Sequence, residues 1–244
     1  MAPCHRPSPL PCLCSGVRMS TVIDWRHIDT VILDMDGTLL DLAFDRDFWL
    51  ARVPAALTQR RGITPAEASA LIDREYHSVR HTLNWYCFDY WSRRLTLDIA
   101  AMNAEFGHTV RLRDDTLPLL SALRQHGRRS ILLTNAHPDG LAVKMRHTGL
   151  GQHLDLLLST HTFGYPKEDQ HLWQRVQTHT GFDPARTLFI DDSEPILDAA
   201  SRFGIRYCLG VSNPDSGVAP QTFRRHSSLN DYRTLLPALA GMMC

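Results

Sequence analysis

A chain of 244 residues is long enough to bury a sizeable core and suits one domain with an insertion, or two small domains. Its 26 basic and 26 acidic residues balance to zero net charge, which argues against nucleic-acid binding and against an acidic solvating tail. No apolar run approaches the roughly 20 residues that span a bilayer, so we expect no membrane association. The six cysteines lack a regular spacing and predict reduced thiols in a cytoplasmic protein.

Residues 1–20 are rich in proline and cysteine, have no hydrophobic periodicity and lack the continuous apolar stretch of a secretory signal. They predict a disordered N-terminal extension, or sequence upstream of a true start at Met19. The spacing of the possible metal ligands in this segment matches none of the usual zinc patterns, which disfavours a metal site formed by Cys4, His5, Cys12 and Cys14.

The first predicted strand, residues 30–33, is a short apolar run that ends in the motif Asp34-Met35-Asp36-Gly37-Thr38. Two carboxylates therefore lie two residues apart, where a strand stops and the chain must turn. In open α/β sheets, ligands bind in the crevice at the carboxyl ends of the strands. A solvated turn is the alternative interpretation, because Asp and Gly are common turn residues.

Residues 45–110 have helical periodicity and no convincing strand, which predicts an all-α insertion between the first and second strands. A helix is expected over 45–61 with Gly62 as its stop, and Thr64-Pro65-Ala66-Glu67 predicts the start of a second helix. A third helical segment, 81–104, holds a cluster of aromatic residues. Several of them fall on one helical face, so we expect part of this cluster to form the core of the insertion.

From residue 115 the predicted helices and strands alternate, which is typical of an α/β fold with a doubly wound parallel sheet and helices on both faces. Strands are expected at 130–134, 154–158, 187–190 and 205–209, with helices at 117–126, 140–147, 168–179, 195–203 and 229–239.

Three further polar motifs accompany this alternating pattern. Thr134-Asn135 and Asp191-Asp192-Ser193 each follow a predicted strand, and Lys167 lies in Gly164-Tyr165-Pro166-Lys167-Glu168. Together with the motif at Asp34, these residues resemble the motifs of the haloacid dehalogenase (HAD) superfamily, over roughly residues 25–235. The resemblance implies a HAD-like Rossmannoid core formed by residues 21–44 and 111–244, and a small all-α cap formed by residues 45–110.

The side chains of these motifs suit phosphoryl transfer, which needs a nucleophile, a proton donor, a cation and hydrogen-bond donors for the phosphoryl oxygens. Asp34 is expected to attack phosphorus and form an aspartyl-phosphate. Asp36 is expected to protonate the leaving group and then to activate water. We expect Thr134 and backbone N–H groups around Asn135 to bind the phosphate, and Lys167 to neutralise charge on the nucleophile and the phosphate.

A carboxylate does not readily attack a phosphate dianion without a cation between them, and Mg²⁺ prefers the oxygen ligands found here. By resemblance, the protein ligands are the side chain of Asp34, the backbone carbonyl of Asp36 and an acid of the pair Asp191-Asp192. Asp192 matches the directly ligating position of the family, and Asp191 is then expected to hold a metal-bound water.

Other functions of the superfamily stay open at this point. Its dehalogenases lack a second aspartate at the position of Asp36, so this residue favours phosphate esters. It does not separate a nucleotidase from a sugar-phosphate phosphatase or a phosphomutase. Two non-enzymatic alternatives are a receiver-like phosphoacceptor, although receivers are shorter and lack a large cap, and an inactive HAD scaffold, although all four motifs are intact.

The run from His81 to Trp91 resembles the cap segment of bacterial GMP/IMP 5′-nucleotidases, as do the runs from Leu157 to Asp169 and from Gly210 to Gly217. The resemblance implies a purine nucleoside 5′-monophosphate as the substrate. The candidate contacts are His81, Asn84, Trp85 and Tyr86. Any single aromatic residue here is more often cap core than a substrate contact. We expect a monomer whose partner is this small phosphate monoester, and we expect His137 and His161, which lie near motifs, to be supporting or surface residues.

Overall fold

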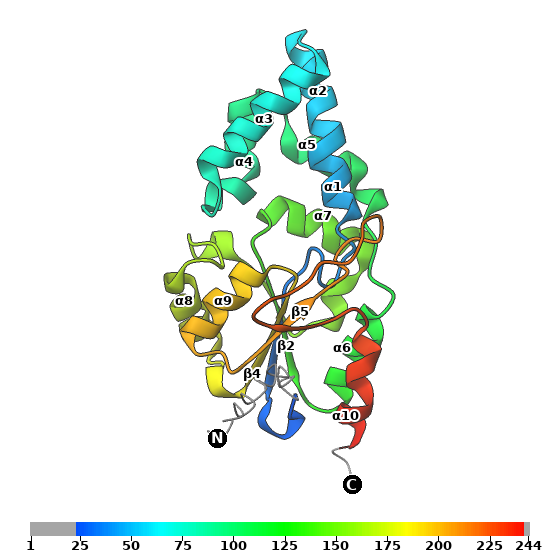
Figure 1. The fold of residues 1–244 in the computed structure, drawn as a ribbon, viewed down its shortest axis with the longest axis vertical. Helices are drawn as coiled ribbons and strands as arrows, with labels where there is room; N and C mark the ends of the chain where they lie inside the picture. Colours follow the sequence, from blue (N-terminus) through cyan, green and yellow to red (C-terminus); the bar gives the residue numbers. More distant parts are fainter. Residues whose placement is uncertain (1–22, 242–244) are drawn as a thin grey trace, which may run out of the picture.

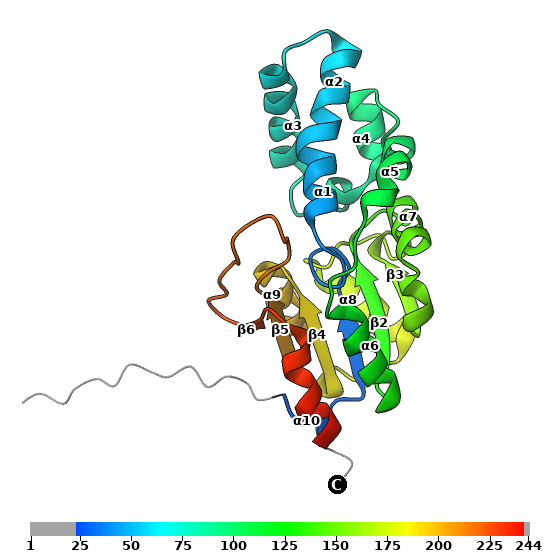
Figure 2. The same ribbon diagram turned by 90° about the vertical axis from the view of Figure 1, so that its right-hand side faces the viewer.

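The computed structural model describes residues 23–241, so the expected disorder of residues 1–20 concerns a segment that lies outside the described residues. A twisted sheet with helices on both faces forms the lower part of the molecule, and a separate group of helices lies above it (Figures 1 and 2). In this described part of the chain, no helix is both long enough and apolar enough to cross a membrane.

Six strands form one parallel sheet in the order β3-β2-β1-β4-β5-β6. The chain winds outward from β1 in one direction, returns, and winds outward in the other, which places a topological switch point between β1 and β4. The strands are β1 Thr30–Leu33, β2 Arg129–Thr134, β3 Leu156–Ser159, β4 Thr187–Asp191, β5 Tyr207–Val211 and β6 Ser227–Leu229. The predicted doubly wound parallel sheet is confirmed.

Successive residues of β1 point to opposite faces of the sheet and enter two different hydrophobic cores. Val31 and Leu33 pack in the core beneath α6 Thr116–Gln125, α7 Pro138–Thr148 and α10 Leu236–Ala240. Ile32 packs in the core beneath the two helices of the other face, which are α8 Gln170–Thr180 and α9 Glu194–Phe203. In Figure 1, α8 and α9 lie on one side of the sheet, and α6 and α10 lie on the other.

The C-terminal part of the chain differs from its prediction. The sheet has a sixth strand, β6, which extends the edge beside β5 with Leu209 opposite Ser227. The predicted helix over 229–239 is short and begins later, as a 3₁₀ turn Tyr232–Leu235 followed by α10. The Ser-Ser-Leu sequence of β6 has no apolar run, so only its pairing with the edge of the sheet makes it a strand.

The upper group of helices is formed by the predicted insertion, and we call it the cap. Its helices are α1 Ala43–Asp47, the π-helix η2 Phe48–Arg52, α2 Val53–Arg61, α3 Pro65–Val79, the 3₁₀ helix η3 Leu83–Tyr86, α4 Phe88–Leu95 and α5 Ile99–Phe106. The expected stop at Gly62 has a left-handed conformation, with φ 64°. The expected start at Thr64 is a capping box with Glu67. The segment 81–104 divides at Cys87, and again at Thr96, where φ is 59°.

The cap has a hydrophobic core of its own, which is separate from the two cores of the sheet. Phe88 and Trp91 are buried in it, which confirms that part of the aromatic cluster is core, while Trp85 packs against it and stays partly exposed. A cap that folds around its own core is suited to moving as one unit over the sheet. The remaining short 3₁₀ helices of the chain are Trp25–His27, Gly107–Thr109, Leu150–His153, Thr160–Thr162 and Pro184–Arg186.

Candidate active site

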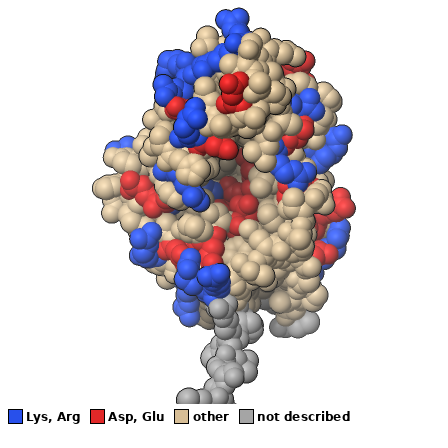
Figure 3. Space-filling model, turned by 45° about the horizontal axis from the view of Figure 1, so that its top comes forward, with Lys and Arg blue, Asp and Glu red and all other residues tan. Residues whose placement is uncertain are grey.

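A cavity of about 410 Å³ lies between the carboxyl ends of the strands and the cap, a size typical of small-molecule sites. Figure 3 shows a hollow on this face of the molecule with acidic side chains inside it. The core contributes polar side chains to the lining, among them Asp34, Asp36, Thr134, Asn135, Lys144, Lys167, Asp191 and Asp192. The cap contributes mainly aromatic side chains, namely Trp49, Tyr76, Trp85, Tyr86 and Phe88. One end of the cavity is therefore charged and the other is aromatic.

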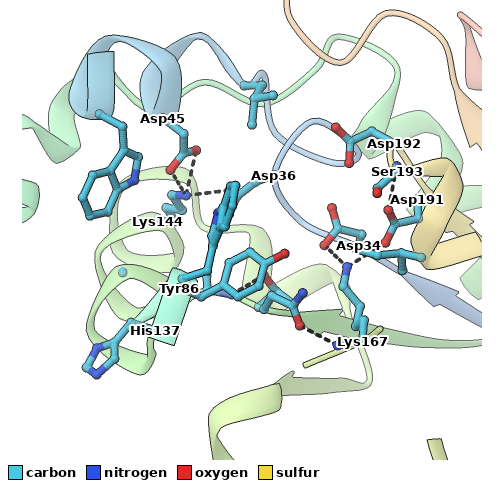
Figure 4. A pocket seen from close by; sticks show the side chains of 18 of the residues that line it. Asp34, Asp36, Asp45, Tyr86, His137, Lys144, Lys167, Asp191, Asp192 and Ser193 are labelled. Atoms are coloured by element: carbon cyan, nitrogen blue, oxygen red, sulfur yellow. Dashed lines mark hydrogen bonds and ion pairs between the residues drawn. The ribbon is translucent and has the colours of Figure 1, made fainter. Parts of the chain in front are cut away.

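Lys167 lies between two carboxylates at the floor of the cavity (Figure 4). Its Nζ donates to Asp34 Oδ1 at 2.5 Å and to Asp191 Oδ2 at 2.6 Å, and all three side chains are buried. Burial lowers the pKa of Lys167, but the charges of Asp191 and Asp34 raise it more, so this pKa lies above its ordinary value. Lys167 therefore stays charged and holds the carboxylate of Asp34 in place.

The neighbouring acids Asp191 and Asp192 differ in what surrounds them. Both oxygens of Asp191 have partners, because Oδ1 accepts the N–H of Ser193 at 2.8 Å and Oδ2 accepts from Lys167. Within residues 23–241, no hydrogen bond to the Asp192 carboxylate is formed. Burial, followed by the charges of Asp191 and Asp34, raises the pKa of Asp192 well above its ordinary value. Asp192 is thus the acid of this pair that is free to bind a cation.

Gly37 allows the turn after β1 to pass close to Asp192. Its φ is +78°, and a Cβ at this position would lie 2.6 Å from Asp192 Oδ2 and 2.9 Å from Pro214 Cβ. Both the backbone conformation and the lack of space therefore require glycine here. The glycine of the first motif brings the loop of Asp34 and Asp36 against the loop of Asp192.

The second motif supports Lys167 from the neighbouring strand. Asn135 Oδ1 accepts the backbone N–H of Lys167 at 2.9 Å, and Asn135 Nδ2 donates to Glu168 at 3.2 Å. The hydroxyl oxygen of Thr134 accepts the N–H of Ala136 at 3.0 Å, and Thr134 lines the cavity. The side chain of Asn135 thereby fixes the position of Lys167, and Asn135 also lines the cavity.

Lys144 and Asp45 were not among the residues singled out from the sequence. Lys144 extends from α7, and its Nζ donates to Asp36 Oδ1 at 2.6 Å and to the oxygens of Asp45 at 2.7 and 2.8 Å (Figure 4). Asp45 belongs to the first cap helix, so one buried lysine joins the second aspartate of the motif to the cap. Nothing in the helical pattern around Lys144 marks it as part of a site. Only the packing of α7 beneath the cap does so.

The neighbours of Asp36 shift its pKa in opposite directions. Burial and the charge of Asp45 raise the pKa of Asp36 to about 6, although Lys144 acts in the opposite direction. Burial lowers the pKa of Lys144, but Asp36 and Asp45 raise it more, so the lysine remains charged. A carboxyl group with a pKa near 6 can hold a proton and release it close to neutral pH.

The charged end of the cavity has the composition of a site for a hard divalent cation. Ligand oxygens of Asp34, Asp191 and Asp192 lie within 4.8 Å of one another. Five aspartates and only two lysines line the cavity, so an anionic phosphate would meet a net negative wall. Oxygen ligands alone, few in number, are the set that Mg²⁺ prefers. The residues present therefore fit the predicted magnesium ion.

The four predicted substrate contacts of the cap fall into two groups. Trp85 and Tyr86 line the cavity, and the Tyr86 hydroxyl donates to Glu168 at 3.0 Å. His81 and Asn84 are exposed and do not line the cavity, although His81 Nδ1 lies 3.8 Å from Glu168 Oε1.

Two aromatic side chains of the cavity wall were missed in the sequence. Trp49 lies on the π-helix and Tyr76 on α3, and their rings are 6.2 Å apart between centroids. Tyr76 in turn lies 5.3 Å from Trp85. These rings come from three separate helical segments, so no local pattern could have grouped them.

The fold and the motif residues assembled at its switch point define a hydrolase of a known class. A family model described as haloacid dehalogenase-like hydrolase matches residues 28–204, and the chain belongs to this family. It is 63% identical over 217 residues to the GMP/IMP nucleotidase YrfG of Escherichia coli K12, covering 89% of this chain and 98% of that protein. The protein of the same name from Shigella flexneri shows the same identity and coverage.

Solved structures agree with this assignment at the level of the fold. A HAD phosphatase from Thermococcus onnurineus has a TM-score of 0.72 at 20% identity, covering 88% of this chain and 99% of that one. An L-2-haloacid dehalogenase from Xanthobacter autotrophicus has a TM-score of 0.60 at 18% identity, with the same coverage. The family match sets aside the receiver-like alternative, and 63% identity to proteins named GMP/IMP nucleotidase, together with the hydrolase family, supports an enzyme over an inactive scaffold.

Proposed function

We propose that the chain is a Mg²⁺-dependent phosphatase that hydrolyses purine nucleoside 5′-monophosphates, with GMP and IMP as substrates, through an aspartyl-phosphate. The observation that carries this proposal is one cavity that joins Asp34, paired with Lys167, to the aromatic wall of the cap. The name of the relatives, GMP/IMP nucleotidase, supports the choice of nucleotide.

Asp34 is the nucleophile of the first half-reaction. Its carboxylate attacks phosphorus, the bond from phosphorus to the ester oxygen breaks, and an aspartyl-phosphate forms. Asp36, held by Lys144, gives its proton to the leaving 5′-oxygen of the nucleoside. Lys167 offsets the negative charge on Asp34 and on the phosphoryl oxygens, while Thr134 and backbone N–H groups near Asn135 donate to those oxygens.

In the second half-reaction Asp36 acts as a base. It takes a proton from water, and the resulting hydroxide oxygen attacks the phosphorus of the aspartyl-phosphate. Asp34 is regenerated and inorganic phosphate leaves. The same carboxyl serves both halves because it loses a proton in the first and gains one in the second.

The side chains of Asp34 and Asp192 and the backbone carbonyl of Asp36 are the proposed magnesium ligands, with Asp191 supporting them. When bound, the ion supplies positive charge that reduces the repulsion between the phosphate and these acids. The free carboxylate of Asp192 supports its role as the direct ligand, whereas both oxygens of Asp191 are already engaged.

The aromatic end of the cavity is suited to a purine base. Trp49, Tyr76 and Trp85 form a continuous set of rings, and a flat heteroaromatic ring gains about 1–3 kcal/mol from such stacking. Binding energy from the base can align the phosphate with Asp34, so it should appear in kcat/KM.

A phosphate-release assay with Mg²⁺ tests the proposal. GMP and IMP should be hydrolysed with higher kcat/KM than the pyrimidine nucleotides UMP and CMP, hexose phosphates and p-nitrophenyl phosphate. Faster turnover of a hexose phosphate would instead identify a sugar-phosphate phosphatase. Interconversion of hexose phosphates without phosphate release would identify a phosphomutase, which uses the same pair of aspartates.

We further propose that residues 45–110 act as the moving cap over a core of residues 21–44 and 111–244, in a monomeric cytoplasmic enzyme. The separate core of the cap supports this division, and the irregular spacing of the cysteines in the sequence supports a reducing compartment. Light scattering coupled to size-exclusion chromatography measures the oligomeric state.

A further inference from the structure

A second group of possible metal ligands lies where the cap meets the core. Cys87, between η3 and α4, belongs to the cap, whereas His137 begins α7 and His161 lies in the 3₁₀ turn after β3. One ligand atom from each of the three residues lies within 4.8 Å of the other two. The three side chains are partly exposed, so an ion could enter. In Figure 4, His137 lies at the end of the pocket away from Asp191 and Asp192.

His161 has a buried ring nitrogen without a hydrogen-bond partner among the described residues. Its Nε2 is buried and makes no hydrogen bond among the described residues, while the ring also interacts with the backbone carbonyl of Asn135. A buried imidazole nitrogen without a hydrogen-bond partner is available to bind a metal ion.

His137 is held in a fixed orientation beside it. Its ring stacks on Phe88 with centroids 5.2 Å apart and lies 5.1 Å from the ring of His161. Nδ1 of His137 accepts the N–H of Asp139 at 3.3 Å, and Asp139 Oδ2 lies 3.5 Å from the same nitrogen. If an ion binds Nε2 of His137, the ring proton is carried by Nδ1, and this N–H can donate a hydrogen bond to the Asp139 carboxylate. Carboxylates commonly support metal-bound histidines in this way.

We propose that Cys87, His137 and His161 bind a Zn²⁺ ion that joins the cap to the core. One thiolate and two imidazoles suit zinc, whereas the oxygen-only group at Asp34 suits magnesium, so the two sites select different metals. Cys87 loses its proton on binding. The fourth position of a tetrahedral ion is open to water or to Asp89, whose Oδ2 lies 3.9 Å from His137 Nε2.

The position of this site gives zinc a specific effect. Because Cys87 moves with the cap and the histidines belong to the core, a bound ion holds the cap closed. A hydrolase of this kind has to open its cap to release products. Zinc therefore stabilises the folded chain and slows turnover.

Cobalt binding tests the site directly and does not depend on the proposed function. Co²⁺ is titrated into the full chain in excess Mg²⁺, and a thiolate-to-cobalt charge-transfer band with visible bands of tetrahedral cobalt should saturate at one ion per chain. Cys87→Ser should remove the charge-transfer band, while the matched control Cys208→Ser should keep it. His161→Gln removes a proposed ligand and should weaken Co²⁺ affinity by at least about 100-fold. Loss of a residue that only hydrogen-bonds to a metal ligand already weakens metal affinity by about 10–100-fold. If the charge-transfer band were absent, or equally strong in Cys87→Ser, the proposed zinc site would be wrong.

Zinc inhibition tests the effect on the cap, and it depends on the proposed phosphatase activity. With saturating Mg²⁺, Zn²⁺ should lower kcat of the unmodified chain and of Cys208→Ser, and a zinc chelator should restore it. Cys87→Ser should keep its rate under the same conditions. Equal inhibition of both variants would place the inhibitory zinc elsewhere and overturn the cap effect. The cobalt spectrum reports on the site even if no phosphatase activity is found.

Discussion

Two buried lysines, Lys167 and Lys144, each lie between a pair of carboxylates at the carboxyl end of the sheet. Lys167 holds Asp34, and Lys144 holds Asp36, so the two aspartates of the first motif have separate cationic supports. Buried charges of this kind cost desolvation energy and are tolerated only when they are paired and hydrogen-bonded. The side chains are thus positioned for chemistry before any substrate binds.

At this scale the first prediction concerns Asp34. Asp34→Asn should remove nearly all phosphate release from GMP, because an amide is a poor nucleophile and cannot form the aspartyl-phosphate. Circular dichroism should show an unchanged fold. A variant that keeps more than a small fraction of the rate would show that Asp34 is not the nucleophile.

The second prediction concerns Lys144. Lys144→Met leaves the partly buried carboxylates of Asp36 and Asp45 without their shared cation, so the free energy of unfolding in urea should fall by about 3 kcal/mol, the lower end of the cost of breaking a buried ion pair. The kcat for GMP should fall by about 10²-fold or more, towards that of Asp36→Asn, because Asp36 loses the group that orients it.

A double variant separates orientation from stability in this network. In the double variant Asp45→Asn with Lys144→Met, only one of the two unpaired carboxylates remains charged. The free energy of unfolding should therefore partly recover relative to Lys144→Met, while kcat stays low. Recovery of kcat together with stability would show that Lys144 only supports the fold.

At the scale of elements, the cap builds the substrate end of the cavity from irregular helices. The π-helix η2 buries Phe48 while Trp49 lines the cavity, and the 3₁₀ helix η3 places Trp85 and Tyr86 on the same cavity. π-helical turns are frequent at functional sites because they change which side chains face inward. The Tyr86 hydroxyl bonded to Glu168 then joins this wall to the residue next to Lys167.

Trp85→Ala should therefore lower kcat/KM for GMP and IMP much more than for p-nitrophenyl phosphate. The loss of one stacking contact, about 1–3 kcal/mol, corresponds to a decrease of roughly 5- to 150-fold on the nucleotides. Tyr90→Ala is the matched control, since Tyr90 contacts Trp91 in the same cap but does not line the cavity. Equal losses on all substrates would mean that Trp85 only stabilises the cap.

At the scale of the whole molecule, we expect the proposed magnesium site to be formed by the sheet and not to depend on the ion for folding. The acids come from the ends of β1 and β4, which are adjacent strands with buried residues. Removal of divalent ions with a chelator should abolish phosphate release and leave the circular dichroism spectrum unchanged. Added Mg²⁺ should restore the rate, and full activity in the chelator would exclude a metal requirement.

The N-terminal segment is predicted to be dispensable. A chain that begins at Met19 should match the full chain in Tm and in the rate on GMP, because residues 1–18 have no periodic apolar face that could pack on the core. A lower Tm or a lower rate would show that this segment contributes to the folded enzyme.

The parallel sheet and the motif residues at the ends of its strands could be predicted from local sequence patterns. Apolar runs such as 30–33 and 187–190 are buried on both faces, and their pattern depends only on neighbouring residues. Because parallel strands end at the same edge, residues that follow separate strands were expected to meet, and Asp34, Thr134 and Asp191 do line one cavity.

Tertiary structure alone decided the residues that join the cap to the core. Lys144, Asp45 and Trp49 lie within helices whose pattern gives no sign of a site, and Cys87, His137 and His161 are far apart in the sequence. Their contacts depend on how the cap sits on the sheet. The short strand β6 likewise exists because the edge of β5 pairs with it. Local patterns report which face of an element is apolar, but not which polar side chains of two packed elements will meet.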